Sequence, residues 1–157
     1  MDLRRAARDP WVWGQLLLLA AVGLGAPYMS RWLSFATPAP AYMLWCGTVV
    51  LLFGVALALW SARALGRALT PSIEPLAGAR LVTAGPYDYV RHPIYLGVTL
   101  LCAGYTLLWT SWVVAMAVGV VVWLYFEGKA RAEERWLVRR FPEYESYMRR
   151  VRRRVLL

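Results

Sequence analysis

A polar, turn-rich stretch from Gly85 to Gly97 carries side chains suited to binding an anionic group. Arg91 and His92 stand directly before Pro93, and proline is accepted at the first position of a helix because its missing N–H is not needed there. The free backbone N–H groups behind Pro93 lie at the positive end of the helix dipole. Such a helix start can hold an anion. The alternative is that Arg91 and His92 only extend towards water at a membrane surface.

A second polar group follows the last long apolar segment. Glu127, Arg131 and Glu134 are spaced i, i+4 and i+7, which places them on one helix face, and Glu133 adds a second carboxylate. Carboxylates beside apolar surface are costly unless they face a cation or water. The group therefore suits a positively charged ligand. The alternative is an ordinary helix ion pair between Glu127 and Arg131, worth only a few tenths of a kcal/mol.

Other kinds of site have little support in the sequence. Cys46 and Cys102 are isolated cysteines in separate apolar segments, without a CxxC pattern, so neither a disulfide nor a metal site is predicted. His92 is the only histidine, which argues against a zinc centre. We find no GxGxxG or Walker motif. The expected chemistry therefore uses no resident metal.

Long apolar segments must position these polar groups. The chain is 60% hydrophobic with a mean hydropathy of +0.46, which is typical of a membrane protein. The charge-free stretch from Pro93 to Phe126 would reach about 51 Å as one helix, too long for one crossing. The polar, aromatic sequence at 109–112 (WTSW) predicts a tight turn in its middle. We therefore predict spans at about residues 11–30, 41–62, 94–109 and 112–127.

The predicted fold is an all-α integral membrane protein with four transmembrane helices and a cytosolic C-terminal helical extension. One domain, residues 1–157, accounts for the whole chain. The basic start before the first span also resembles a signal peptide, but a chain beginning at Met1 favours a retained span. Arg31 to Pro40 is expected to be a short loop, because two prolines in three residues do not continue a helix.

The basic residues predict an orientation. With four spans, all but Arg31 of the 18 Lys and Arg residues fall on one side of the membrane. The positive-inside rule then places both termini in the cytoplasm, and a bacterial inner membrane is the expected location. Anionic headgroups are the natural partner of this charge, so nucleic acid is not needed to explain it.

The tail beyond Glu127 is predicted to form two cytosolic helical pieces covering residues 128–154. Its apolar residues recur at steps of four and three, which marks one helix face: Leu137, Phe141, Tyr144, Met148 and Val151. Pro142 interrupts the pattern and predicts a second helix start. For residues 141–157, a plain amphipathic surface helix is the preferred interpretation.

Both polar groups resemble signatures of the isoprenylcysteine carboxyl methyltransferase family. The first is Gly85-Pro86-Tyr87 followed by the run from Arg91 to Gly97; the second is Glu133-Glu134 followed by Leu137, Phe141, Tyr144 and Tyr147. Together they cover about the last half of the chain. Phospholipid and thiol methyltransferases carry similar blocks, and membrane sterol reductases share the first, so the acceptor is left open.

The resemblance implies S-adenosylmethionine as cofactor, S-adenosylhomocysteine as product and a lipophilic acceptor. The acceptor would be an isoprenylcysteine-like carboxylate, a phospholipid amine or a small thiol. Arg131, with Glu127, is expected to orient it as the catalytic group. The expected cofactor-binding residues are Tyr87, Val90, Arg91, His92, Tyr95, Gly97, Glu133 and Glu134. Phe141-Pro142 replaces the family's common Phe-Gly, and the chain is short, which weakens transfer of prenylcysteine specificity.

Two other classes of function are weighed against methyl transfer. An NADPH-dependent sterol-type reductase would use the same pocket, but Glu133 and Glu134 would repel a phosphate. A non-catalytic membrane scaffold or lipid-binding protein explains the hydrophobicity but not the polar signatures. In the methyltransferase interpretation the turn at 109–112 brings His92 beside Glu133 and Glu134, so that the two signatures form one site.

Overall fold

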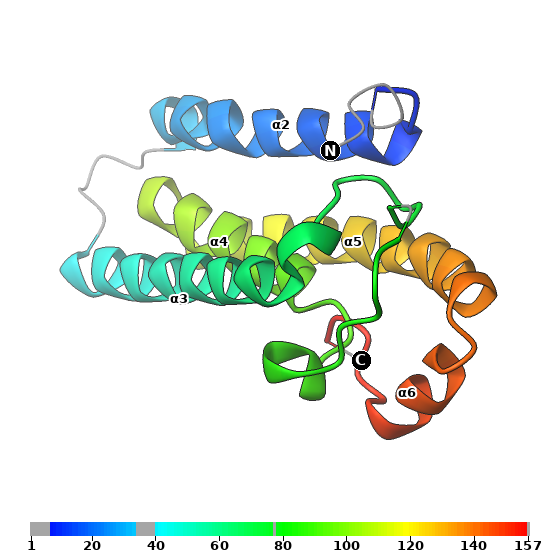
Figure 1. Ribbon diagram of the computed structural model, residues 1–157. Coiled ribbons are helices and arrows are strands. Elements are labelled where there is room, and N and C mark those ends of the chain that lie inside the picture. The colour runs from blue at the N-terminus through cyan, green and yellow to red at the C-terminus, as the bar shows by residue number, and fades with distance from the viewer. Residues whose placement is uncertain (1–6, 34–39, 77, 157) are drawn as a thin grey trace.

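The computed structural model describes residues 7–33, 40–76 and 78–156, and every regular element in these ranges is helical. The described residues form the α-helices labelled in Figure 1: α2 (Pro10–Leu33), α3 (Ala41–Leu65), α4 (Pro93–Trp109), α5 (Trp112–Arg140) and α6 (Tyr144–Arg150). Two 3-10 turns precede α4: η1 (Gly66–Ala68) and η2 (Gly85–Asp88). The all-helical prediction is confirmed. In the described part of the chain, three helices are long and apolar enough to cross a membrane, and they begin at Pro10, Ala41 and Trp112.

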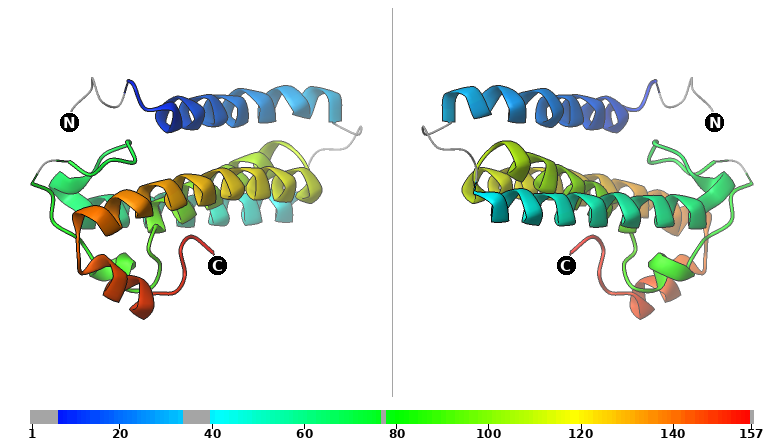
Figure 2. Two further views of the ribbon diagram at one scale, coloured as in Figure 1. Left: turned by 90° about the vertical axis from the view of Figure 1, so that its right-hand side faces the viewer. Right: turned by 90° about the vertical axis from the view of Figure 1, so that its left-hand side faces the viewer.

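The helices form layers. In Figures 1 and 2, α2 lies over one face of a central layer of α3, α4 and α5, and α6 with the C-terminal segment lies beyond the opposite face. α4 packs most extensively against α3 and also contacts α5 and α2. Large apolar side chains stay exposed on the outer faces of α2, α3 and α5, including Leu24, Trp45, Phe53 and Val113. Such continuous apolar surface identifies an integral membrane protein.

Glycines permit the close packing of α3 on α4. A Cβ added to Gly104 would lie 2.4 Å from the backbone nitrogen of Leu51, and one added to Gly54 would lie 2.5 Å from that of Leu101. Both distances are shorter than a real carbon can accept, and the obstructing atoms are backbone atoms that cannot rotate away. Small residues at these positions let two apolar helices approach closely, as in other membrane helix pairs.

The predicted break between the last two apolar helices is confirmed. α4 ends at Trp109 and α5 begins at Trp112. Ser111 forms the N-cap of α5, and its side chain accepts a hydrogen bond from the N–H of Val114 at 3.5 Å. The resulting hairpin carries the chain back, so that the later part of α5 passes the beginning of α4.

The boundary after the first long helix differs from the prediction. α2 continues to Leu33, so Arg31 and Trp32 are helical rather than part of a loop. The helix accommodates Pro27, and the sequence has no further proline or glycine until Pro38, which permits the extension. Residues 34–39 of the expected loop, and the predicted cytoplasmic arginines Arg4 and Arg5, lie outside the described residues.

The tail departs further from expectation. Its first piece is the uninterrupted continuation of α5 to Arg140, and α6 ends at Arg150. The helical prediction for residues 151–154 is therefore wrong, as is the interpretation of 141–157 as a plain surface helix. Val151 and Val155 are buried in an extended segment. Hydrogen bonds to the backbone before α4 replace those of a continued helix.

Candidate active site

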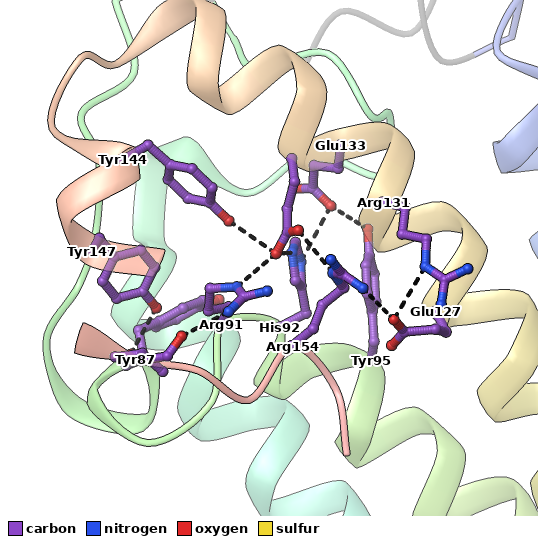
Figure 3. A network of polar contacts seen from close by, with 12 residues as sticks. Tyr87, Arg91, His92, Tyr95, Glu127, Arg131, Glu133, Tyr144, Tyr147 and Arg154 are labelled. Atoms are coloured by element: carbon purple, nitrogen blue, oxygen red, sulfur yellow. Dashed lines mark hydrogen bonds and ion pairs between the residues drawn. The ribbon is translucent and has the colours of Figure 1, made fainter. Parts of the chain in front are cut away.

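The structure brings the two sequence signatures into contact. His92 lies just before α4, and its Nδ1 is 3.5 Å from Oε2 of Glu133 on α5. Its Nε2 is 3.4 Å from Oε1 of Glu134, without the alignment of a hydrogen bond. Figure 3 shows these side chains converging between the end of α5, the start of α4 and the C-terminal segment. The hairpin predicted from residues 109–112 is what makes this contact possible.

Glu134 is enclosed by cations. Its Oε1 lies 2.7 Å from Arg91 Nε, and its Oε2 lies 2.7 Å from Arg154 Nε. The hydroxyl of Tyr144 also donates to Oε1, at 3.4 Å. Both Arg91 and Glu134 are buried. A buried charge needs such partners, since removing one leaves the other uncompensated.

Arg154 extends this cluster to Glu127. Its Nη1 pairs with Oε1 of Glu127, which also lies 3.4 Å from Arg131 Nε, whereas Oε2 is buried without a hydrogen-bond partner. We call Arg91, Glu134, Arg154 and Glu127 the carboxylate–arginine network. Arg131 is at its margin, with 66% of its side chain exposed. The helix ion pair considered from the sequence is therefore present.

The C-terminal segment, residues 151–156, closes over the start of α4. The backbone N–H groups of Arg91 and His92 donate to the carbonyls of Arg153 and Arg154, both at 2.9 Å. Arg91 Nη1 donates to the carbonyls of Val151 and Arg152 at 2.7 and 2.8 Å. The C-terminal segment thereby binds both the main chain and the side chain of Arg91.

The N–H groups at the start of α4 are also largely used within the chain. Tyr95 and Leu96 donate to the carbonyl of His92 at 3.1 and 3.3 Å. Both belong to the N–H groups behind Pro93 that are predicted to face an anion. The helix start is therefore tied to its own backbone in this structure, and the side chains of the site face the adjoining space.

Glu133 points away from the network and towards a cavity of about 400 Å³. It accepts a hydrogen bond from the hydroxyl of Tyr95 at 2.6 Å, and 24% of its side chain is exposed. The Tyr95 ring is stacked on His92, with centroids 5.3 Å apart, and on Phe126, at 4.8 Å. This stack fixes the orientation of Tyr95 and thereby of Glu133.

Tyrosines form much of the remaining polar wall. Tyr147 donates to the carbonyl of Tyr87 at 2.7 Å, and Tyr144 and Tyr147 pack together at 5.5 Å. Burial and then the negative charge of Glu133 raise the pKa of Tyr87. Burial and then the charge of Glu134 raise the pKa of Tyr144. These phenols therefore stay protonated, acting as hydrogen-bond donors and aromatic surfaces rather than as bases.

The similarity to known proteins covers the same part of the chain. The model of the phospholipid methyltransferase family matches residues 42–144, which include α3, α4, α5 and most of the site. The chain belongs to this family. Membership agrees with the resemblance carried by the two signatures and with the apolar outer faces of the helices.

Individual relatives match a shorter region. The protein-S-isoprenylcysteine O-methyltransferase of Schizosaccharomyces pombe is 38% identical over 72 residues, 45% of this chain and 30% of the relative. The cobalt-zinc-cadmium resistance protein CzcN of Cupriavidus metallidurans is 36% identical over 71 residues, 45% of this chain and 33% of the relative. Protein-S-isoprenylcysteine O-methyltransferase B of Arabidopsis thaliana is 36% identical over 73 residues, 46% of this chain and 37% of the relative. The match spans about a third of the length of these relatives.

The residues expected to bind a cofactor in this family member fall into four places. The cavity wall includes Tyr87, Arg91, His92, Tyr95 and Glu133. Glu134 belongs to the carboxylate–arginine network, and Val90 is half-buried away from the cavity wall. Gly97 lies in the contact with α3, where a Cβ would be 2.8 Å from the nitrogen of Ala58.

The residues expected to orient an acceptor lie elsewhere. Arg131 borders a more open hollow with Glu134, Arg135 and Arg154, on a different surface from the cavity beside Glu133. Glu127 is held between Arg131 and Arg154. The structure therefore separates this pair from the wall that carries His92 and Glu133.

Sequence reasoning missed two features of the site. Arg154 was counted only as part of a basic tail, because nothing local distinguishes it from its neighbours. Asp9 was also passed over: it accepts hydrogen bonds from Ser72 Oγ at 2.7 Å and from the N–H of Ile73 at 3.0 Å. Although burial opposes ionisation, these bonds lower the pKa of Asp9, and the ion fastens the start of α2 to the loop beside the cavity.

Proposed function

We propose that this family member transfers a methyl group from S-adenosylmethionine to a lipophilic acceptor at the membrane. The observation that carries the proposal is the meeting of His92, Tyr95 and Glu133 on the wall of one cavity at the end of the α4–α5 hairpin. The names of the yeast and plant relatives support a methyltransferase whose acceptor bears an isoprenyl chain.

The residues present fit such a donor. A cavity of about 400 Å³ falls within the usual range for small-molecule sites. Glu133 supplies a carboxylate with one hydrogen-bond donor already in place, which suits an ammonium or sulfonium group. The rings of Tyr87 and Tyr147 also line the cavity and offer aromatic surface for a planar base or for a cation. His92 Nε2 is a buried polar atom that lacks a hydrogen bond.

We assign different parts of the expected cofactor set to different tasks. Tyr87, Arg91, His92, Tyr95 and Glu133 would contact the donor. Glu134 would hold Arg91 and the C-terminal segment in place, and Gly97 would set the distance between α3 and α4. Val90 lies away from the cavity wall and would act only through the backbone of its neighbours.

The chemistry needs alignment more than acid–base groups. When bound, S-adenosylmethionine supplies a methyl group already activated by its sulfonium. Glu133 would orient the positive end of the donor, and Tyr95 would hold the Glu133 carboxylate through its hydroxyl. The buried aromatic wall would exclude water. Arg131 and Glu127 would orient an acceptor only if it reaches the hollow beside Arg154.

We also propose a topology with four spans. α4 has 17 residues and would reach only about 26 Å, so it would cross with local thinning of the bilayer. Both termini and the connection from η1 to His92 would be cytoplasmic, in a bacterial inner membrane, with anionic headgroups near the basic tail. Residues 1–157 would form a single methyltransferase domain. Impermeant labelling of Ala84→Cys in intact cells tests this, since labelling from outside contradicts it.

Calorimetry on the purified protein tests the proposed reaction. S-adenosylhomocysteine should bind and NADPH should not, because Glu133 at the cavity wall favours a cationic group and opposes phosphate. Glu133→Gln serves as the matched variant and should weaken S-adenosylhomocysteine binding. Binding of NADPH without S-adenosylhomocysteine would instead support a reductase, and binding of neither would contradict a cofactor-dependent function.

A further inference from the structure

One cation of the site stands apart from the arginine-rich remainder of the chain. Lys129 is the only lysine among the 18 basic residues, and its side chain is fully buried, with 0% exposed. Its ammonium donates to Gln15 Oε1 at 2.5 Å and to the carbonyl of Pro71 at 2.8 Å. It also lies 5.5 Å from the centre of the Tyr95 ring. No carboxylate of the described residues forms an ion pair with it within 4.0 Å.

Such an arrangement is costly without a further purpose. A buried cation is normally compensated by an anion. The direct contacts of the Lys129 ammonium are neutral oxygen acceptors and an aromatic face, whereas the charges of Asp9 and Glu133 act on it from beyond ion-pair distance. An ammonium has three N–H donors, and the two hydrogen bonds leave one of them without an assigned partner. The ammonium is therefore held in place by the fold, with Asp9 and Glu133 as the anions that act on it and no carboxylate of the described residues in direct contact.

The charge borders the same cavity as Glu133. Gln15 from α2, Pro71 from the loop after η1 and Lys129 from α5 all line it. Lys129 precedes Glu133 by one helical turn, so both residues lie on one face of α5. The cavity thus has a cationic end beside α2 and an anionic position beside His92. Two charges of opposite sign along one wall suit two ligand groups of opposite sign.

The side-chain amide of Gln15 determines which hydrogen-bonding groups the cationic end of the cavity presents to a ligand. Only the amide oxygen of Gln15 can accept a hydrogen bond from the ammonium. Its Nε2 therefore faces away from Lys129, with two N–H donors for another partner. Gln15 is half-buried and lines the cavity. An anionic oxygen placed there would receive hydrogen bonds from Gln15 and would be attracted by the charge of Lys129 behind it.

We propose that Lys129 and Gln15 form an anion subsite at the α2 end of the cavity, which binds the carboxylate of the methyl acceptor. This inference rests on the proposed methyltransferase function. A carboxylate could also come from the amino-acid part of the donor. The acceptor fits better because α2 presents exposed apolar side chains such as Leu17 and Leu24, so a lipophilic molecule can reach this end along α2.

The charge balance of the reaction agrees with this assignment. The acceptor's carboxylate oxygen would attack the donor's methyl carbon; the C–O bond would form as the C–S bond breaks, with the bonding pair going to sulfur. The carboxylate becomes a neutral ester and the sulfonium becomes a neutral thioether, so no proton has to leave. An amine acceptor would instead end as a cation beside Lys129, which like-charge repulsion opposes. The subsite therefore selects anionic acceptors over amines.

Binding measurements on the full chain in lipid nanodiscs test the subsite. The probes are N-acetyl-S-farnesylcysteine, its carboxamide, and S-adenosylhomocysteine. Lys129→Gln, which keeps hydrogen-bond donors but removes the charge, should bind the carboxylate probe at least tenfold more weakly. The carboxamide and S-adenosylhomocysteine should change by less than twofold. Arg140→Gln removes an exposed charge from the same helix, outside both hollows, and should change none of them.

Two results would overturn the assignment. Unchanged affinity for the carboxylate probe in Lys129→Gln would show that Lys129 binds no acceptor anion. A loss confined to S-adenosylhomocysteine would show that the subsite serves the donor's carboxylate instead. Lys129→Met removes the hydrogen bonds of Lys129 as well as its charge. The additional loss of affinity for the carboxylate probe, relative to Lys129→Gln, would measure how much the positioning of Gln15 contributes to binding.

A spectroscopic measurement works without any variant. Because Lys129 is the only lysine, protein labelled with lysine carrying ¹⁵N at Nζ gives one side-chain signal. The carboxylate probe should shift it and the carboxamide should not; an unmoved signal contradicts the subsite. If S-adenosylhomocysteine binds while the signal is unmoved, the subsite fails and the proposed function stands. If the signal moves but S-adenosylhomocysteine does not bind, the proposed function fails and the anion site stands.

Discussion

Glu133 and Glu134 are neighbours in sequence but belong to different parts of the molecule. Glu133 faces the cavity, accepts one hydrogen bond from Tyr95 and keeps about a quarter of its side chain exposed. Glu134 is buried between Arg91 and Arg154, and both of its oxygens have cationic partners. Adjacent helix positions point about 100° apart, so one short stretch can serve two surfaces.

This difference distinguishes a carboxylate that can bind a ligand, Glu133, from one that stabilises the fold, Glu134. Glu134 is already compensated, so a ligand ammonium at this carboxylate would have to displace an arginine. Glu133 has capacity left, since a carboxylate can accept several hydrogen bonds. The sequence presents these two acidic residues as equivalent. In the structure, Glu133 can bind a cation, whereas Glu134 holds the surrounding segments together.

The largest expected effect comes from Glu134→Gln. The amide cannot balance the charges of buried Arg91 and of Arg154, so we expect the free energy of unfolding to fall by about 3–5 kcal/mol. Denaturation of the purified protein in detergent measures it, with the exposed Glu145→Gln as control. Unchanged stability together with a loss of S-adenosylhomocysteine affinity would reverse the comparison and make Glu134 the ligand group.

Glu133→Gln should produce the complementary result. Loss of a charge-assisted contact should weaken S-adenosylhomocysteine binding by about 1.5–3 kcal/mol, which is roughly tenfold or more. Stability should change by less than about 1 kcal/mol, because the amide oxygen can still accept from Tyr95. Calorimetry and denaturation on the same preparation measure both quantities. A variant that loses stability but binds normally would place Glu133 with the structural groups.

Tyr147→Phe tests the tyrosine wall that the regions around Glu133 and Glu134 share. It removes the hydroxyl that donates to the buried carbonyl of Tyr87 and should lower the free energy of unfolding by about 1–2 kcal/mol. Tyr89→Phe is the matched control, because Tyr89 is 72% exposed. Equal melting temperatures for the two variants would show that the Tyr147 hydroxyl does not stabilise the wall.

The smallest effect is expected for Arg131→Gln. Its side chain is mostly exposed and Glu127 keeps Arg154 as a partner, so stability should fall by only about 0.3–0.5 kcal/mol. Denaturation measures this, and turnover with a carboxylate acceptor shows whether Arg131 also acts in catalysis. A tenfold loss of turnover without a loss of stability would place the acceptor at the hollow beside Arg154 rather than in the cavity beside Glu133.

Much of the helical framework is predictable because its causes are local. Charge-free stretches of sufficient length give α2, α3 and α5, and the polar residues at 110 and 111 end one helix and begin the next. The hairpin then requires that the start of α4 and the later part of α5 lie together. That topological consequence was enough to predict the contact of His92 with Glu133 and Glu134.

The placement of single side chains was less predictable. The i, i+4, i+7 spacing put Glu127, Arg131 and Glu134 on one face but did not say what faces them. The structure turns that face towards Arg154 and turns Glu133 towards Tyr95. Helical spacing determines which side chains are neighbours on one helix, whereas their partners come from distant segments whose positions depend on the whole chain.

The sequence by itself determined the apolar helices, the turn between α4 and α5, and the family of the two signatures. Only the tertiary structure decided that residues 151–156 leave the helical pattern and close over Arg91, and that Lys129 lies buried between Gln15 and Pro71. The physical reason is the range of the interactions. Helix formation follows from residues a few positions apart, whereas Arg91 and Val151 are 60 residues apart and Gln15 and Lys129 are 114 apart. Such contacts exist only once the remaining elements have packed.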